Sequence, residues 1–111
     1  LIFYSYFSTG RTKKMFQHIV LYKLKDGSMQ AKKALKEKFM SMQGNVEQIK
    51  QIEVGIDVLQ GDRSFDVSLF IRFANMQDFL DYKSHPYHLQ VAEFVQKVKD
   101  KSVSVDYEDN D

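Results

Sequence analysis

The side chains of this chain that could move a proton near neutral pH gather in one stretch, DYKSHPYH at residues 81–88. It holds two of the three histidines, His85 and His88, on either side of the only proline, and Tyr82 comes shortly before them. A neutral imidazole both donates and accepts a hydrogen bond, and its unperturbed pKa of about 6.5 suits proton transfer. A tyrosine hydroxyl can bind a substrate carbonyl or stabilise a developing enolate. An enzyme using these groups would run an aldol or dehydration reaction on a carbonyl compound.

The periodicity of the sequence indicates that two of the histidines point inward. His18, the remaining histidine, alternates in phase with Tyr22 on a mostly apolar face of a predicted strand. His88 precedes Val91 by three residues, so it lies on or beside the apolar stripe of a predicted helix. We therefore expect His18, Tyr82 and His88 to line one cavity as candidate catalytic residues, with Tyr22 as a further cavity or structural residue.

Each of these residues also has a purely structural interpretation. His85 directly precedes Pro86, so its imidazole would most simply bind local backbone at the start of a helix. His18 could equally be a satisfied core histidine, and Tyr82 could pack its ring and send its hydroxyl to a partner. Two hypotheses stay open: a binding module with a small hydrophobic cavity, or a cofactor-free lyase or cyclase. The enzyme hypothesis requires that His18 and His88 approach one shared ligand, whereas the binding hypothesis does not.

Other kinds of site have little support in the sequence. With no cysteine and three histidines, a zinc site would have to recruit carboxylates such as Asp81, so we predict no metal. No glycine-rich phosphate loop stands between a strand and a helix, so we predict no cofactor. The net charge of +1 lacks the concentrated basic patch of a nucleic-acid binder. The absence of cysteine fits a reducing compartment, and we expect a cytoplasmic protein without a membrane partner.

Hydrophobic periodicity predicts the elements that must position these residues. Strand-like alternation marks residues 16–25, 49–59, 65–73 and 102–108, and helical spacing marks residues 29–43, 76–83 and 87–100. The order β-α-β-β-α-β, with the second helical segment broken at Pro86, predicts an α+β, ferredoxin-like fold. This fold is a four-stranded antiparallel sheet with helices on one face. Ser28 and Asn75 suit the N-cap positions, and Gly44 suits the end of the first helix.

Two further expectations concern surfaces. Lys32, Lys33 and Lys36 should form the solvated face of the first helix. The second sheet face lacks helices, yet the first strand is apolar on both faces and Phe70 lies on the polar side of the third strand. An uncovered apolar face predicts a partner, and the simplest is a second copy related by a two-fold axis. We therefore predict a homodimer formed through the open sheet face.

The chain divides into three parts. Residues 1–14 carry three basic residues and no acid, and their apolar run LIFYSYF fits neither a signal peptide nor a membrane span. We expect Met15 to be the functional start and 1–14 to be an upstream or non-native extension; the competing interpretation is an arm that covers a partner. Residues 15–108 form the single domain, and 109–111 are an acidic tail.

Three segments of this sequence together resemble one known family. HIVLYKLKDG at 18–27, FLDYKSHPYHLQVAEFV at 79–95 and VSVDYE at 103–108 are similar to the stress-responsive dimeric α/β-barrel (Dabb) domain family, over residues 15–108. The resemblance implies a small homodimer with a cavity between sheet and helices in each subunit. Many members of the family have no assigned reaction.

The resemblance also implies roles for individual residues. One relative, a plant polyketide cyclase, uses cavity histidines and a tyrosine in an intramolecular aldol-type condensation. The matching positions here are His18, Tyr82 and His88, and His85 matches the family's histidine before proline. A third-strand histidine of the cyclase corresponds to Val67, so one polar cavity group is missing. We expect a stress-responsive dimer that holds a small hydrophobic carbonyl compound; the alternative is a cofactor-free lyase or cyclase acting on a polyketide-like or β-dicarbonyl substrate.

Overall fold

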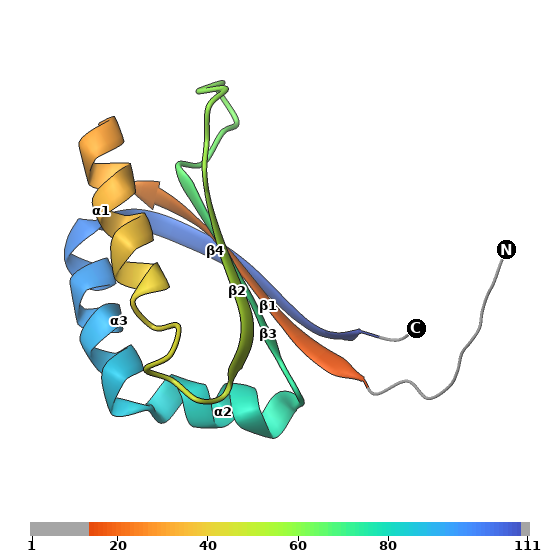
Figure 1. Ribbon diagram of the computed structural model, residues 1–111. Helices are drawn as coiled ribbons and strands as arrows, with labels where there is room; N and C mark the ends of the chain where they lie inside the picture. The colour runs from red at the N-terminus through yellow and green to blue at the C-terminus, as the bar shows by residue number, and fades with distance from the viewer. Residues whose placement is uncertain (1–13, 110–111) are drawn as a thin grey trace, which may run out of the picture.

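The computed structural model describes residues 14–109, which form a four-stranded sheet with helices on one face (Figure 1). The elements are β1 (Met15–Leu24), α1 (Met29–Met40), β2 (Ile49–Ile56), β3 (Val67–Phe73), α2 (Met76–Ser84), α3 (Pro86–Val98) and β4 (Lys99–Asp109). The strands are antiparallel and their order is β2-β3-β1-β4, which confirms the predicted ferredoxin-like fold. The extension predicted at 1–14, except for its last residue, and residues 110–111 lie outside the described residues.

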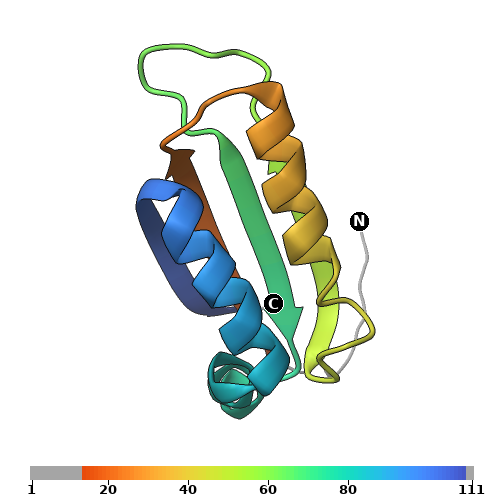
Figure 2. The same cartoon turned by 90° about the vertical axis from the view of Figure 1, so that its left-hand side faces the viewer.

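The core lies between the helices and the inner face of the sheet. Figure 2 shows α1 in front of β2 and β3, and α3 on the side of β1 and β4. Alternate residues of the two central strands are buried against these helices: Phe16, Val20 and Leu24 in β1, and Val67, Leu69, Ile71 and Phe73 in β3. No helix within residues 14–109 is long and apolar enough to cross a membrane.

The helix starts form where the local sequence predicts them, but α1 and α3 end two or three residues earlier than predicted. The side chains of Ser28 and Asn75 accept hydrogen bonds from backbone N–H groups in the first turns of α1 and α2. Pro86 is the first residue of α3 and ends the preceding helix. The helix α1 ends at Met40 rather than at residue 43, so Gly44 (φ +86°) belongs to the following turn.

The prediction that the α1 lysines share a solvated face is wrong for Lys32. Lys33 and Lys36 are exposed, but Lys32 is only 3% exposed, and its Nζ lies 3.8 Å from Asp66 Oδ1. The other carboxylate oxygen of Asp66 accepts a hydrogen bond from the backbone N–H of Leu24. The aliphatic stem of Lys32 therefore packs inward because a buried carboxylate lies beside its ammonium group.

The edge strands differ from the predicted bounds at their ends. β2 stops at Ile56, and Val58, predicted within that strand, is 86% exposed in the β2–β3 connection. β4 begins at Lys99, because α3 ends at Val98 and the chain turns directly into the strand. It continues to Asp109, one residue beyond the predicted domain. The Asp109 carboxylate accepts hydrogen bonds from the Gln17 and Arg72 side chains, so it is part of the sheet rather than of a tail.

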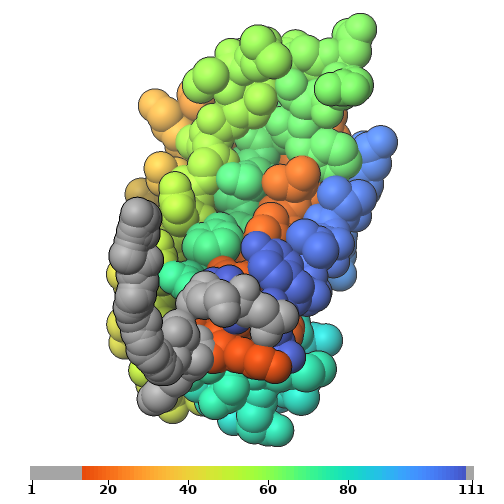
Figure 3. Space-filling view, turned by 90° about the vertical axis from the view of Figure 1, so that its right-hand side faces the viewer, coloured from red at the N-terminus to blue at the C-terminus, as the bar shows by residue number. Residues whose placement is uncertain are grey.

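Figure 3 shows the sheet face opposite the helices. The centre of this face is apolar. We call it the open-face patch; it consists of Ile19 and Leu21 of β1, Phe70 of β3, and Val103, Val105 and Tyr107 of β4. Ile19 pairs with Phe70 on one side and with Val105 on the other, so three apolar residues form a row across the sheet. Leu21 is 38% exposed and Val105 is 53% exposed.

Candidate functional site

A cavity of about 250 Å³ lies between the helices and the β1–β4 side of the sheet. Its lining residues are His18, Val20, Tyr22, Phe39, Tyr82, His88, Val91, Ala92, Val95, Gln96, Lys99, Ser102 and Ser104. The four predicted cavity residues, His18, Tyr22, Tyr82 and His88, are therefore brought to one space from β1, α2 and α3. The volume lies slightly below the roughly 300–1,000 Å³ typical of drug-sized ligands, so the cavity suits a small molecule.

Tyr82 is the central ring of the site. Its ring centroid lies 5.9 Å from that of His18 and 4.2 Å from that of His88. Phe79, one helical turn earlier on α2, lies 4.9 Å from the His18 ring and fills the space behind it. Because Pro86 separates α2 from α3, Tyr82 and His88 come from different helices and can face the same cavity.

His88 has one ring nitrogen engaged and one available. Its Nδ1 lies 3.1 Å from the Lys83 carbonyl oxygen, which can only accept, so Nδ1 carries the hydrogen. Burial lowers the pKa of His88 below its usual value, and the nearby charge of His18 lowers it further. The hydrogen bond to the Lys83 carbonyl opposes this shift without reversing it. At neutral pH Nε2 therefore carries a lone pair and can accept a proton.

His18 is paired with a carboxylate that the sequence analysis did not identify. Its Nδ1 lies 2.5 Å from Asp106 Oδ1, and the side chains are 13% and 33% exposed. Asp106 is the residue directly opposite His18 in the β1–β4 pairing. A carboxylate at this nitrogen fixes the imidazole's orientation and places the other nitrogen, Nε2, away from Asp106. The available signal was the alternation of β4, in which Ser102, Ser104 and Asp106 share the face opposite Val103 and Val105.

The two tyrosines of the cavity remain protonated over the physiological range. Burial raises the pKa of Tyr22 to about 12. The pKa of Tyr82 is raised further, first by burial and then by the nearby Tyr22 and Asp106. Neither phenol can serve as a base at neutral pH. Each is a hydrogen-bond donor, and the Tyr82 ring lies beside both histidine rings.

His85 lies outside the cavity lining and binds local groups. Its Nδ1 accepts a hydrogen bond of 3.0 Å from the backbone N–H of Tyr87, and its Nε2 lies 3.1 Å from Glu47 Oε1. This arrangement makes His85 the N-cap of α3. Val67 is also absent from the lining, and it is buried opposite Tyr22 in the sheet. The third-strand position therefore adds no polar group to the cavity.

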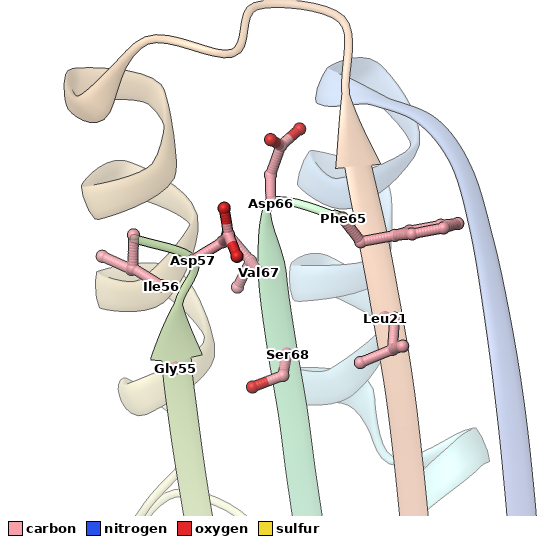
Figure 4. A pocket seen from close by; sticks show the side chains of 8 residues that line it. All are labelled: Leu21, Gly55, Ile56, Asp57, Phe65, Asp66, Val67 and Ser68. Carbon is pink, nitrogen blue, oxygen red and sulfur yellow. The ribbon is translucent and has the colours of Figure 1, made fainter. Parts of the chain in front are cut away.

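A second hollow, of about 270 Å³, lies on the open sheet face near the ends of β2 and β3 (Figure 4). Leu21, Phe65 and Ser68 line it, together with the carboxylates of Asp57 and Asp66. It contains no histidine, so it lacks the paired acid and base of the first cavity. Within residues 14–109, no group of three or more histidine, aspartate or glutamate side chains could hold a metal ion.

The sequence and the fold of this chain are similar to those of known proteins. The model of the family described as the stress responsive A/B barrel domain (Dabb) matches residues 16–109. No curated protein matches the sequence. Among solved structures, a dimeric protein of unknown function and ferredoxin-like fold from Bacteroides fragilis is 29% identical, with a TM-score of 0.73. The match covers 86% of this chain and 96% of that one.

Two further solved structures share the fold at lower identity. A hydroxynitrile lyase from Passiflora edulis is 22% identical with a TM-score of 0.76, over 87% of this chain and 94% of that one. A Dabb family protein with a ferredoxin-like fold from Mesorhizobium loti is 18% identical with a TM-score of 0.75, over 89% of this chain and 100% of that one. At these identities the likeness concerns the fold.

Proposed function

This chain belongs to the stress-responsive A/B barrel domain (Dabb) family, and from that membership we propose a homodimer that holds a small hydrophobic carbonyl compound in each subunit. The binding site is the cavity lined by His18, Tyr82 and His88. One observation carries the proposal: His88, which has one ring nitrogen available, and Tyr82 line a cavity together with apolar side chains from β1, α1 and α3. A carbonyl oxygen there would accept a hydrogen bond from Tyr82, and an adjacent O–H or C–H would meet His88. The lack of cysteine supports a cytoplasmic location.

Dimerisation through the open sheet face is supported by the chemistry of that face. The open-face patch is too apolar and continuous to be an ordinary solvated surface. Beside it, Gln17 Oε1 and Arg72 Nε are buried and form no hydrogen bond with any residue in the described part of the chain. A second copy would supply apolar contacts to the patch and partners for these two atoms. The neighbour from Bacteroides fragilis is itself described as dimeric.

The second candidate function is cofactor-free catalysis, and the His18–Asp106 pair favours it. We propose that His88 Nε2 removes a proton from the carbon between two carbonyls of a β-dicarbonyl substrate. The Tyr82 hydroxyl donates a hydrogen bond to the resulting enolate oxygen. The enolate carbon then attacks a second carbonyl carbon, forming a C–C bond, and the new alkoxide takes a proton from the His88 imidazolium.

His18 has a supporting role in this reaction. Because Asp106 accepts the Nδ1 hydrogen, His18 Nε2 carries a lone pair and can accept a hydrogen bond from an enol or hydroxyl O–H of the substrate. Cleavage of a C–C bond is the same sequence in reverse, and the Passiflora edulis neighbour is named as a lyase. In a homodimer, each subunit would contain one such carbonyl-binding site, for binding alone or for this chemistry.

Binding and turnover can be measured separately. Native mass spectrometry with benzoylacetone, a neutral β-diketone, should show one bound molecule per subunit, and His88→Ala should abolish binding. Leu89→Ala is the matched control, because Leu89 lies next to His88 on α3 but is exposed and outside the cavity. Turnover of a 3,5,7-trioxo ester to a cyclic product of the same mass, formed by the new C–C bond, would establish the cyclase. Binding without turnover would leave the binding function alone, and absence of binding to the wild type would contradict both.

A further inference from the structure

The cavity has a second polar end that the proposed chemistry does not use. Gln96, Lys99, Ser102 and Ser104 line it beyond the histidines. We propose that the ligand carries a carboxylate as well as a carbonyl, and that Lys99 binds the carboxylate. This inference rests on the proposed function, because it assumes that the carbonyl lies beside His88 and Tyr82.

The two ends of the cavity are separated by a well-defined length. Asp106 pairs with His18 in the sheet, while Ser102 pairs with Tyr22, four positions away along each strand. At about 3.3 Å per residue this is roughly 13 Å. On the opposite wall, His88 and Gln96 are eight residues apart on α3, or roughly 12 Å at 1.5 Å per residue. Both walls therefore describe an elongated cavity with a polar group at each end.

A β-bulge determines which charge reaches the second end. The β1–β4 register shifts between Lys23 and Leu24, so Leu24 pairs with Lys99 rather than with Asp100. Leu24 faces the helices, and its partner does so too. Without the bulge, regular alternation from Ser102 would place Asp100 on the helix-facing side. The bulge thus replaces a carboxylate by an ammonium group in the cavity lining, and bulges commonly re-aim side chains in this way beside active sites.

The polar groups at this end are available for a ligand. Within residues 14–109, the side chains of Ser102 and Ser104 form no hydrogen bond, and Lys99 forms no ion pair at 4.0 Å or less. Asp100 is exposed and does not line the cavity. A carboxylate placed here would bind the Lys99 ammonium and accept hydrogen bonds from the two hydroxyls.

Charge also fixes the direction in which such a ligand binds. The Asp106 carboxylate lies at the histidine end and repels a second carboxylate there. Lys99 attracts it at the other end, and the apolar side chains of Val20, Val91 and Val95 surround the middle. The matching ligand is an extended oxo acid whose carbonyl and carboxylate lie roughly 10–13 Å apart, as the strand spacing requires.

The experiment compares one acid with its neutral ester. Isothermal titration calorimetry with 10-oxodecanoic acid and methyl 10-oxodecanoate should show that the wild type prefers the acid by about ten-fold or more, as expected for one charge-assisted contact. Lys99→Gln should remove this preference, so that the variant binds the acid and the ester with similar affinity. Lys101→Gln is the control, since Lys101 is exposed on the same strand and lies over the Phe65 ring.

The outcomes separate this inference from the proposed function. Equal affinities for acid and ester in the wild type would overturn the carboxylate site and leave carbonyl binding intact. Loss of the preference in Lys101→Gln as well would show a general charge effect and would also overturn it. If neither compound binds and benzoylacetone does not bind either, the proposed function fails together with the inference. Thermal unfolding checks that Lys99→Gln is folded. We expect it to be, because Lys99 follows the last residue of α3 and its backbone is extended.

Discussion

His18 Nδ1 and Asp106 Oδ1 lie 2.5 Å apart across the antiparallel β1–β4 pair, although the two residues are 88 positions apart in sequence. The pairing register alone brings them together, because each is the other's direct neighbour in the sheet. The contact gives the cavity one imidazole held by a carboxylate, while the Lys83 carbonyl holds the other, His88. The two histidines therefore have different surroundings in one cavity, which suits different roles for them.

The first prediction concerns Asp106→Asn. The amide has the same shape but can bind either tautomer of His18, so the lone pair is no longer held on Nε2 and turnover of a carbonyl substrate should fall by roughly 100-fold. Nitrogen NMR of the imidazole should show hydrogen on Nδ1 in the wild type and a mixture of tautomers in the variant. Glu108→Gln, an exposed residue later in β4, is the control. An unchanged tautomer and unchanged turnover in Asp106→Asn would show that the pair has no functional role.

The second prediction concerns the pH dependence of His88. Its pKa is lower in the folded protein than in the unfolded chain, so the unfolded state binds the proton more readily. The stabilising contribution is complete above the unfolded value of about 6.5 and is lost as the pH falls through the lower folded value. Between pH 7.5 and pH 5, the wild type should lose more free energy of unfolding than His88→Gln. Urea unfolding at both pH values measures this; equal losses in the two proteins would contradict it.

Ligand binding should follow the same titration. A protonated His88 has no lone pair on Nε2, so affinity for a β-diketone should decrease below the folded pKa of His88. The histidine NMR titration of the free protein gives that pKa independently. The midpoint of the binding curve should coincide with it, and a midpoint that follows His85 instead would assign the effect to the α3 cap.

The sequence predicts the fold well because its signals are local. Ser28, Asn75 and Pro86 mark helix starts. Strand alternation identifies His18 and Tyr22 as residues that face inward. The predicted approach of His18, Tyr82 and His88 follows from the same periodicity together with the family resemblance. These signals act over a few residues, so they do not depend on how distant strands are aligned.

Contacts between elements that are far apart in the sequence could not be predicted. Asp106 was missed because its role depends on the β1–β4 register. Lys99 was missed because it was predicted to lie in the helix at 87–100, whereas it begins β4 beside a bulge. Lys32 was placed on the surface because its counterion, Asp66, lies on another element. In each case the deciding contact is long-range, and no spacing within one segment reports it.

The third prediction concerns this buried ion pair. Asp66→Ala removes the carboxylate beside Lys32 and the acceptor of the Leu24 N–H, so it should lower the free energy of unfolding by about 3 kcal/mol or more. Lys32→Met replaces the charge by an apolar side chain of similar length and should lie within about 1 kcal/mol of the wild type. Urea unfolding measures both, with the exposed Lys33→Ala as control. A small effect of Asp66→Ala would show that water solvates the Lys32 ammonium group in place of the carboxylate.

The fourth prediction concerns the open-face patch. Val105→Asp places a carboxylate at the centre of the proposed dimer interface, in the row that Ile19 and Phe70 share with it. Burying that unpaired charge should weaken dimerisation by at least about 2 kcal/mol, or roughly 30-fold in Kd. Sedimentation velocity over a micromolar concentration series measures the shift toward monomer. Val105 is 53% exposed in the single chain, so the variant should fold, and near-ultraviolet circular dichroism checks this.

Val58→Asp is the matched control for this experiment. Val58 is also an exposed valine, but it lies in the β2–β3 connection rather than on the sheet face, so its charge should leave the dimer intact. If both variants dissociate, the effect of the added charge is not specific to the sheet face and the interface is not located. If Val105→Asp stays dimeric while remaining folded, the subunits meet elsewhere, and the unpartnered Gln17 and Arg72 atoms must be satisfied without a second copy.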